Sequence, residues 1–227
     1  MIDIMIVKLG TIGLDIAKYT FHLFAVNKMG RVIKKKQLKR KQELAYFAKL
    51  EPCLIAMEAC GGANYWAREL IVLGHAVKLI APPYVKPFVK GNKNDFNDAE
   101  GITEAAQRPN MRFVPIKCIE QQDIQNFHRQ RERIKKQRKA LVSQIRGLLA
   151  EYGIVIDKGL KAVREALPEI LEDFENNLTC LTRDLFAELL EELKVIEQRF
   201  RSCEKRIITL NKDNDTNRIK YLPTCTC

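Results

Sequence analysis

Strand-like and helix-like spacings of apolar residues alternate along the first part of the chain. Three short runs of strand-forming residues come first, with very little sequence between them. Residues 27–30 supply turn chemistry between the second run and the third. This pattern predicts a meander of three strands, which cover residues 11–17, 21–26 and 31–38.

After the meander, helical and strand spacings follow one another. Residues 42–50 carry their apolar side chains at helical spacing. Residues 53–57 are apolar on both faces, which is typical of a central strand covered by helices on each side. Asn64 is a suitable cap for a second helix, and Gly74 ends that helix. The predicted elements are a helix over residues 42–50, a strand over 53–57, a helix over 64–73 and a strand over 75–80.

The order of these elements, three strands followed by helix, strand, helix and strand, is that of RNase H-like folds. We therefore predict an α/β domain with a mixed sheet and flanking helices. Three prolines interrupt residues 81–93, which predicts an exposed connection. Helical spacing resumes over residues 94–107. The residues that share one face of this helix are Asp95, Asp98, Ile102 and Ala105.

Beyond Pro115, apolar residues follow a heptad pattern in two long segments. Residues 153–177 permit a reversal between them, so the sequence predicts a long antiparallel coiled-coil hairpin. Self-association would satisfy the same heptads, and we expect a homo-oligomer formed through the coiled coil. Arg131 and Arg138 interrupt the first series. The apolar positions are Ile124, Phe127, Ile134, Leu141, Ile145 and Leu148, then Phe186, Leu189, Leu193, Ile196, Phe200, Cys203, Ile207 and Leu210.

Composition and charge narrow the classes of function. The chain has 227 residues, of which 46% are hydrophobic, enough for one compact core with an elongated appendage. Its 39 Lys and Arg outnumber its 28 Asp and Glu, and the net charge of +11 favours binding to phosphate backbones. Nucleic acid is therefore the leading partner class. A ribosomal or membrane-surface protein can be equally basic, so charge alone does not decide.

The cysteines and histidines predict no metal site of their own. The seven cysteines are odd in number, widely spread and without CxxC spacing, so neither a disulfide framework nor a zinc ribbon is indicated. Strand or surface roles are expected for His22, His75 and His128, whose spacing suggests neither a metal site nor a triad. Reduced thiols, and an opening segment too short and too charged to span a membrane, predict a cytoplasmic protein without membrane association.

Four acidic residues fall where this fold can bring them together. Asp15 lies on the first predicted strand, Glu58 follows the fourth, and Asp95 and Asp98 lie one turn apart on a helix. Carboxylates a few ångströms apart resist joint ionisation unless cations are present. Mg²⁺ prefers oxygen ligands, and two such ions about 3.5 to 4 Å apart support phosphodiester cleavage.

Each of these acids also has an ordinary explanation. Asp15 can simply end a strand, Glu58 can be solvated, and the two aspartates can favour a helix N-terminus through its dipole. Taken together they are harder to explain in this way. Asp15 interrupts an apolar run and Glu58 follows a buried strand, and carboxylates on a buried side call for a partner. We interpret the four as candidate metal-binding and catalytic residues.

Two groups of basic residues are candidates for contacts with nucleic acid. Three lysines of the proline-rich connection alternate with Tyr84 and Phe88, a pattern that suits phosphate contact and base stacking, or else a solvated loop with two anchoring aromatics. The basic run on the first heptad helix suits a nucleic-acid backbone, with an ordinary charged coiled-coil face as the alternative. The candidates in these two groups are Lys86, Lys90, Lys93, Arg129, Arg131, Arg133, Lys135, Lys136 and Arg138, and Lys18, outside both groups, is a further candidate.

Three segments that contain the acids resemble the motifs of a known family. They read Gly-Leu-Asp-Ile-Ala-Lys at residues 13–18, Met-Glu-Ala-Cys-Gly at 57–61 and Lys-Asn-Asp-Phe-Asn-Asp-Ala at 93–99. In this order, and followed by a basic helix, they resemble the DEDD, RuvC-like transposases of insertion-sequence family 110. The resemblance covers residues 11–148 closely and extends more loosely through the second helix, where the family also has a coiled-coil arm.

The resemblance implies that Asp15, Glu58, Asp95 and Asp98 hold two Mg²⁺ ions, which Mn²⁺ can replace, and that the protein cuts and rejoins DNA when an insertion sequence moves. It also implies a guide RNA encoded by the element. Members of the family continue into a second domain with a nucleophilic serine. No serine of this chain lies in that motif, so we expect truncation or a frameshift and do not expect complete strand transfer by this chain alone.

The predicted organisation has three parts. Residues 1–115 form a RuvC-like catalytic domain, residues 116–215 a coiled-coil arm, and residues 216–227 the start of a missing domain. A junction-resolving nuclease with the same acids is one alternative, which bound RNA would exclude. A non-catalytic coiled-coil module that binds nucleic acid is another, which metal dependence would exclude.

Overall fold

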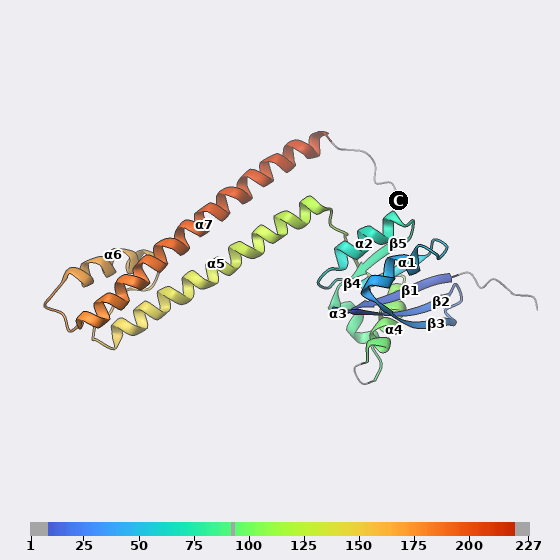
Figure 1. Cartoon of the computed structure of the whole chain (residues 1–227), viewed down its shortest axis with the longest axis horizontal. Coiled ribbons are helices and arrows are strands. Elements are labelled where there is room, and N and C mark those ends of the chain that lie inside the picture. Colours follow the sequence, from blue (N-terminus) through green and yellow to red (C-terminus); the bar gives the residue numbers. More distant parts are fainter. Residues whose placement is uncertain (1–8, 92–93, 221–227) are drawn as a thin grey trace, which may run out of the picture. The chain divides into compact units, whose positions relative to one another are not determined.

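The computed structural model describes residues 9–91 and 94–220. The chain divides into two compact units, Met1–Cys118 and Ile119–Cys227. The first is an α/β unit, and the described residues of the second form helices (Figure 1). The candidate acids all lie in the first unit.

A six-stranded mixed sheet forms the centre of the first unit (Figure 1). Its order is β3-β2-β1-β4-β5-β6, in which β1 to β3 form an antiparallel meander and β4 and β5 run parallel to β1. The predicted order of elements is confirmed, and the fold is of the RNase H-like α/β type. The strands are β1 Leu9–Ile16, β2 Thr20–Asn27, β3 Val32–Lys39, β4 Leu54–Glu58, β5 Ala76–Ile80 and β6 Phe113–Val114.

Helices cover both faces of the sheet (Figure 1). Leu14 and other core residues of the strands pack against α1 and α2. Gly13, which alternates with Leu14 along β1, faces α4. The three central residues of β4 are buried, as predicted for a strand covered on both sides. The helical elements are η1 Arg40–Gln42, α1 Glu43–Phe47, α2 Ala63–Val72, α3 Pro82–Val85, η2 Lys86–Phe88 and α4 Asp95–Ala106.

One local prediction for this unit is wrong. Asn64 does not cap α2: the N-cap is Gly62 at φ 90°, and Asn64 Oδ1 accepts a hydrogen bond from Lys117 N at 2.9 Å. The proline-rich connection is largely exposed over its described residues, as predicted, and it also forms the short helices α3 and η2. Pro82 occupies the start of α3, where proline has the φ angle of a helix and no N–H is needed.

The second unit is built on two long helices that run in opposite directions. Cys203 Sγ lies 3.5 Å from Phe127 O near one end of the pair, and Tyr152 Oη lies 2.9 Å from Thr182 Oγ1 near the other. Most of the predicted apolar heptad positions are buried in one core between them. Among the described residues, no helix is long and apolar enough to cross a membrane. The helices are α5 Ile119–Ala150, α6 Leu160–Glu172 and α7 Cys180–Lys220.

The reversal between the long helices contains α6, which the sequence analysis did not predict. Val163 and Leu167 are buried in the same core as the long helices. The apolar residues of this segment do follow helical spacing, but Pro168 falls inside it, and proline is unfavourable in the interior of a helix. At the other end, α7 continues to Lys220, and the remainder of the predicted segment 216–227 lies outside the described residues.

The two arginines that interrupt the heptads pack against an aromatic ring. The guanidinium of Arg138 lies 4.3 Å from the centre of the Phe200 ring, and that of Arg131 lies 5.7 Å from it. Arg131 Nε also pairs with Glu204 at 3.2 Å. A cation is attracted to the face of an aromatic ring, so arginine can occupy these two interhelical positions in place of an apolar residue.

Candidate metal centre

Asp15 and Glu58 lie on the same face of the sheet. β1 and β4 are parallel neighbours, with Leu14 paired to Met57, and each acid is the next residue along its strand. Because side chains of neighbouring strands at equal register point to the same side, both carboxylates face α4. The sheet therefore places both acids on one side, as a shared metal site requires.

Gly13 allows α4 to lie directly on β1. A Cβ atom on this glycine would be 2.2 Å from Ala99 O and 2.2 Å from Thr103 Oγ1, so no larger residue fits. Thr103 Oγ1 also lies 3.2 Å from Phe24 O, which ties the helix to β2. The close approach brings the first turn of α4 near Asp15, two residues further along the strand.

The start of α4 is fixed by a side-chain cap. Asn94 Oδ1 accepts a hydrogen bond from Phe96 N at 3.0 Å, which confirms a helix that begins at this point. Asp95 and Asp98 both fall in the first turn, where the helix dipole favours negative charge. The cap and the dipole therefore place two acids beside Asp15 and Glu58 at reduced electrostatic cost.

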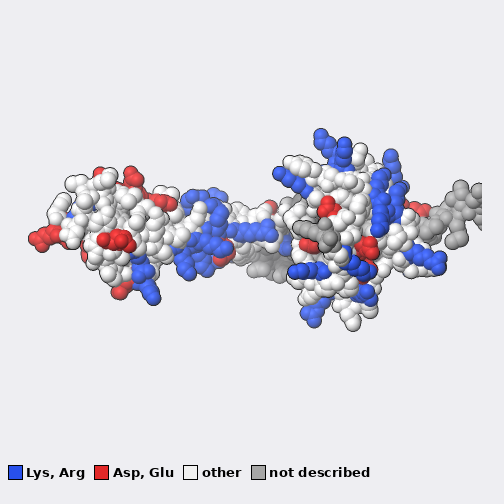
Figure 2. All heavy atoms as spheres, turned by 90° about the horizontal axis from the view of Figure 1, so that it is seen from below, with Lys and Arg blue, Asp and Glu red and all other residues white. Residues whose placement is uncertain are grey.

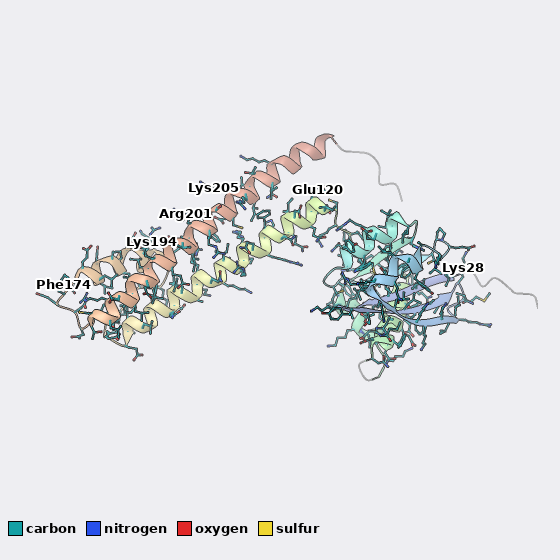
Figure 3. All side chains as sticks on the ribbon, in the orientation of Figure 1. Lys28, Glu120, Phe174, Lys194, Arg201 and Lys205 are labelled. Atoms are coloured by element: carbon teal, nitrogen blue, oxygen red, sulfur yellow. The ribbon has the colours of Figure 1, made fainter. Side chains whose placement is uncertain are left out.

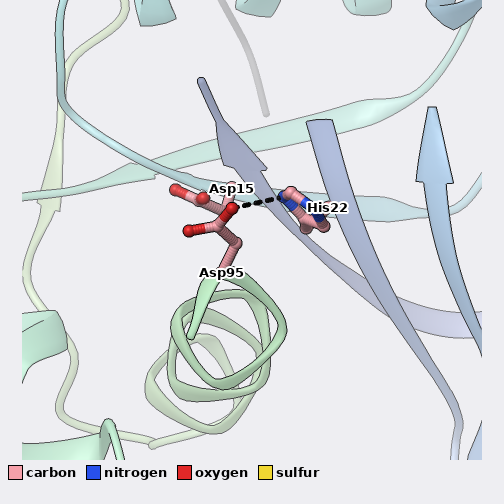
Figure 4. Close-up of side chains that lie close together, drawn as sticks. All are labelled: Asp15, His22 and Asp95. Atoms are coloured by element: carbon pink, nitrogen blue, oxygen red, sulfur yellow. Dashed lines mark ion pairs between the residues drawn. The ribbon is translucent and has the colours of Figure 1, made fainter. Parts of the chain in front are cut away.

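Three side chains form the tightest group (Figure 4). A carboxylate oxygen of Asp15, a ring nitrogen of His22 and a carboxylate oxygen of Asp95 all lie within 4.8 Å of one another. His22 Nδ1 is 3.5 Å from Asp95 Oδ2. Among the described residues, this is the one group of three or more potential ligands that meets this spacing, so Glu58 and Asp98 lie outside it.

Electrostatics nevertheless couple Glu58 and Asp98 to the group. Burial, followed by the charges of Asp98, Asp95 and Glu58, raises the pKa of Asp15 from 3.8 to about 6, against a lowering by His22. Burial, followed by the charge of Asp98, raises the pKa of Glu58. The four predicted acids are thus electrostatically coupled and form one region of negative charge. Such a region is suited to divalent cations.

His22 is the residue that the sequence analysis missed. It lies opposite Asp15 in the β1–β2 register and is 5% exposed. A strand or surface role was expected for His22 because the spacing of the three histidines from one another suggested no metal site. The short hairpin between residues 16 and 20 fixes a register that pairs these two positions, and that local signal was available in the sequence.

The basic candidates of the first unit differ in their surroundings. Lys18 and Lys86 are exposed, and Lys90 is paired with Glu104 on α4. Lys93 lies outside the described residues. Phe88 is half-buried against the core beside α4 and has the Arg108 guanidinium over its ring, so it anchors the connection, whereas Tyr84 is exposed.

Strand β3 is a second basic feature that the sequence analysis did not single out. It lies at the edge of the sheet and carries Lys34, Lys35, Lys36 and Lys39. Lysines on an edge strand discourage pairing with other chains, and they also suit phosphate contacts.

Basic residues of the second unit gather along part of its length. Figure 2 shows Lys and Arg over one stretch of this unit and Asp and Glu toward the end that holds α6. Arg129, Arg133, Lys135 and Lys136 of α5 are exposed. Arg201 and Lys205 continue the basic stretch along α7, and both are exposed (Figure 3). A surface of this kind suits a polyanion.

The fold and the site together define the class of this protein: an RNase H-like sheet that holds carboxylates at the ends of its central strands. Within this class, the family model of the DEDD transposases of insertion-sequence family 110, described as transposase, matches residues 12–154. The chain belongs to this family, as the three motifs indicated.

Curated relatives agree with this assignment. The chain is 47% identical over 201 residues to a probable family 20 transposase of Pseudomonas aeruginosa, covering 88% of this chain and 60% of the relative. It is 41% identical over 213 residues to the transposase for insertion sequence element IS1111A of Coxiella burnetii, covering 93% and 58%. The transposase for insertion sequence element IS1328 of Yersinia enterocolitica is 37% identical over 195 residues, covering 84% and 58%. The chain thus spans somewhat more than half the length of these relatives.

A similar solved structure is that of T. thermophilus RuvC in complex with a Holliday junction substrate. It aligns with 46% of this chain and 98% of its own, at 13% identity and a TM-score of 0.31. The sheet topology and the family match, rather than this likeness, establish the fold class and the family.

Proposed function

We propose that this chain carries the DNA-binding and Mg²⁺-dependent strand-cleavage centre of an insertion-sequence transposase, guided by an RNA that the element encodes. The observation that carries the proposal is the convergence of acids from β1, from the end of β4 and from the first turn of α4 on one face of the sheet. The names of the curated relatives support DNA transposition as the process. The chain spans 60% or less of each of these relatives, so the activity of the whole protein is part of the proposal.

Asp15, Glu58, Asp95 and Asp98 would hold the cations, which we take to be two Mg²⁺ ions that Mn²⁺ can replace. All four supply carboxylate oxygens, the ligands that hard divalent cations prefer. The raised pKa of Asp15 also fits, because burial, followed by the charges of Asp98 and Asp95, disfavours its ionised form, and bound cations would offset this. The chemistry that such cations supply when bound is activation of the attacking oxygen and stabilisation of the leaving oxygen in phosphodiester cleavage.

The chain itself positions these acids before DNA binds. Asp15 is held by a strand that pairs on both sides, and Asp95 by a capped helix. The Asp95 side chain is 55% exposed, so it forms the solvent side of the group, where a DNA backbone has access. Ligands on rigid elements need little rearrangement, which is the condition for efficient electrostatic catalysis.

The basic residues would hold the nucleic acid. On α5, the exposed side chains of Arg129, Arg133, Lys135 and Lys136 are placed to contact phosphates, while Arg131 and Arg138 chiefly pack on α7. In the first unit, Lys18, Lys86, Lys90 and Lys93 are the corresponding candidates. Contacts of this kind do not depend on sequence, and they weaken as salt rises.

The organisation that we propose keeps the predicted boundaries. Residues 1–115 form the catalytic domain, and residues 116–215 form an antiparallel coiled-coil arm through which copies of the chain associate. The buried heptad core of α5 and α7 supports the arm.

The experiment is a cleavage assay with the purified chain and DNA that carries the ends of the element. The chain should bind DNA and nick it only when Mg²⁺ or Mn²⁺ is present, and Asp98→Asn should abolish nicking while leaving binding unchanged. Glu51→Gln, at an exposed position of the same unit, is the matched control and should nick normally. Nicking that is unaffected by chelation or by Asp98→Asn would overturn the proposal.

Extraction of nucleic acid from the purified complex tests the guide. A discrete RNA from the element should co-purify with the chain. Metal-dependent nicking of branched DNA without any RNA would instead support a junction-resolving nuclease.

A further inference from the structure

We propose that His22 is a direct nitrogen ligand of the cation site, so that the centre has a mixed oxygen and nitrogen donor set. This inference rests on the proposed metal site and adds a residue outside the four acids. It is carried by the burial of His22, by its unpartnered ring nitrogen and by the direction in which that nitrogen points.

The His22 ring nitrogen Nδ1 lies beside Asp95 but makes no hydrogen bond among the described residues. The residue is 5% exposed, and Nδ1 is buried without a hydrogen-bond partner in the part of the chain that the structure describes. Leaving a buried polar atom unsatisfied costs about 1 to 3 kcal/mol, so proteins rarely keep one without a reason. By contrast, both ring nitrogens of buried His75 are engaged, Nδ1 with Cys53 N and Nε2 with Phe47 O.

The unpartnered nitrogen points into the acidic group (Figure 4). It lies 3.5 Å from Asp95 Oδ2, and it shares the 4.8 Å group with Asp15. Two ligand atoms at about 2.1 Å from one ion lie at most about 4.2 Å apart. The spacing of these atoms is therefore close to that of ligands of a single cation.

Packing holds the ring in this orientation. The His22 ring meets the Phe96 ring edge to face, with centroids 4.8 Å apart and an interplanar angle of 76°. Phe96 follows Asp95 in the first turn of α4, so the element that supplies one acid also orients the imidazole. A ring fixed in this way is prepared for coordination.

A nitrogen ligand changes which cation the site prefers. Carboxylates suit Mg²⁺ and Mn²⁺ alike, whereas imidazole favours transition-metal ions. The ratio of Mn²⁺ affinity to Mg²⁺ affinity should therefore fall by about tenfold in His22→Asn, the order of change seen when support of a metal ligand is lost. His128→Gln, at an exposed position of α5, should leave the ratio unchanged.

Pulsed electron paramagnetic resonance of bound Mn²⁺ tests the contact directly. The wild-type chain with one equivalent of Mn²⁺ should show coupling to a coordinated ¹⁴N nucleus, which His128→Gln retains and His22→Asn loses. The wild-type spectrum is informative even where His22→Asn fails to fold, because His75 engages both of its ring nitrogens.

The outcomes separate this inference from the proposed function. Mn²⁺ binding without nitrogen coupling, the result expected if His22 is only a charged partner of Asp95, overturns the inference and leaves the carboxylate site standing. Coupling that persists in a folded His22→Asn variant also overturns it. Failure of the wild-type chain to bind Mn²⁺ overturns both proposals.

Discussion

Gly13 and Thr103 meet so closely across the contact between β1 and α4 that a Cβ atom on the glycine would lie 2.2 Å from Thr103 Oγ1. The same atom would lie 2.2 Å from Ala99 O, so backbone as well as side chain would have to move. The acids of α4 reach Asp15 because this contact is short. The glycine of the first motif is therefore part of the geometry of the site, although it bears no chemistry.

Gly13→Ala should displace α4 and damage the site. Overpacking of this kind costs about 1 to 3 kcal/mol, and contact with a backbone oxygen places the expected loss at the upper end. Denaturant unfolding measures the stability, and titration with Mn²⁺ should show weaker binding in the folded variant. Gly147→Ala is the control, because nothing lies within 4 Å of its Cβ position on α5, and it should raise stability by about 0.5 to 1 kcal/mol. Equal Mn²⁺ affinity in Gly13→Ala and wild type would contradict this account.

The sequence predicted the sheet well because its strands carry strong local patterns. Short turns join neighbouring strands of the meander, and the strand before Glu58 is an uninterrupted apolar run. Strand positions therefore follow from the spacing of apolar residues and from turn chemistry. Asp15 and Glu58 were placed correctly on the sheet for the same reason, since Asp15 lies within a recognisable strand and Glu58 directly follows one. The heptads of α5 and α7 likewise predicted which residues are buried.

The features that escaped prediction depend on tertiary contacts. Strand β6 has only two residues, too few to show a period, and it pairs with β5. Asn64 has the chemistry of a helix cap, but Lys117 N, which is distant in sequence, competes for its oxygen. The position of His22 beside Asp15 and Asp95 depends on the register of a hairpin and on a helix more than seventy residues away. Patterns of residue type do not report such contacts.

Glu43 should make the stability of the first unit depend on pH. It is fully buried, and neither carboxylate oxygen has a hydrogen-bond partner among the described residues. Burial raises its pKa from 4.5 to about 8, against a lowering by Arg40 and with a smaller rise from Glu69. The folded state therefore holds a proton that the unfolded state releases. Its contribution is fully present below about pH 4.5 and is lost as pH rises toward 8, at no more than about 1.4 kcal/mol per pH unit.

Glu43→Gln should remove this dependence. The neutral amide has no proton to release, so the variant should lose less stability than the wild type between pH 5 and pH 8 in urea unfolding. Glu51→Gln, an exposed neighbour, should behave as the wild type. Identical pH profiles for Glu43→Gln and the wild type would show that Glu43 is ionised in the folded state.

The exposed basic face of α5 should contribute to nucleic-acid affinity through charge. Replacing Arg133 and Lys136 together with Gln removes two neighbouring cations from one helix face. The slope of log affinity against log salt should fall by about one for each lost phosphate contact, with similar losses for unrelated DNA sequences. Fluorescence anisotropy over a range of salt concentrations measures this slope. Lys161→Gln on α6 is the control, and a loss of the same size there would show that net charge alone matters.

The convergence of Asp15 with the acids of β4 and α4 into one cation site is tested most directly by calorimetric titration of Mn²⁺ into the metal-free chain. Wild type and Glu51→Gln should bind with the same affinity, and Asp15→Asn should bind at least about tenfold more weakly. The absence of saturable binding in the wild-type chain, or equal affinity in a folded Asp15→Asn variant, would contradict the account.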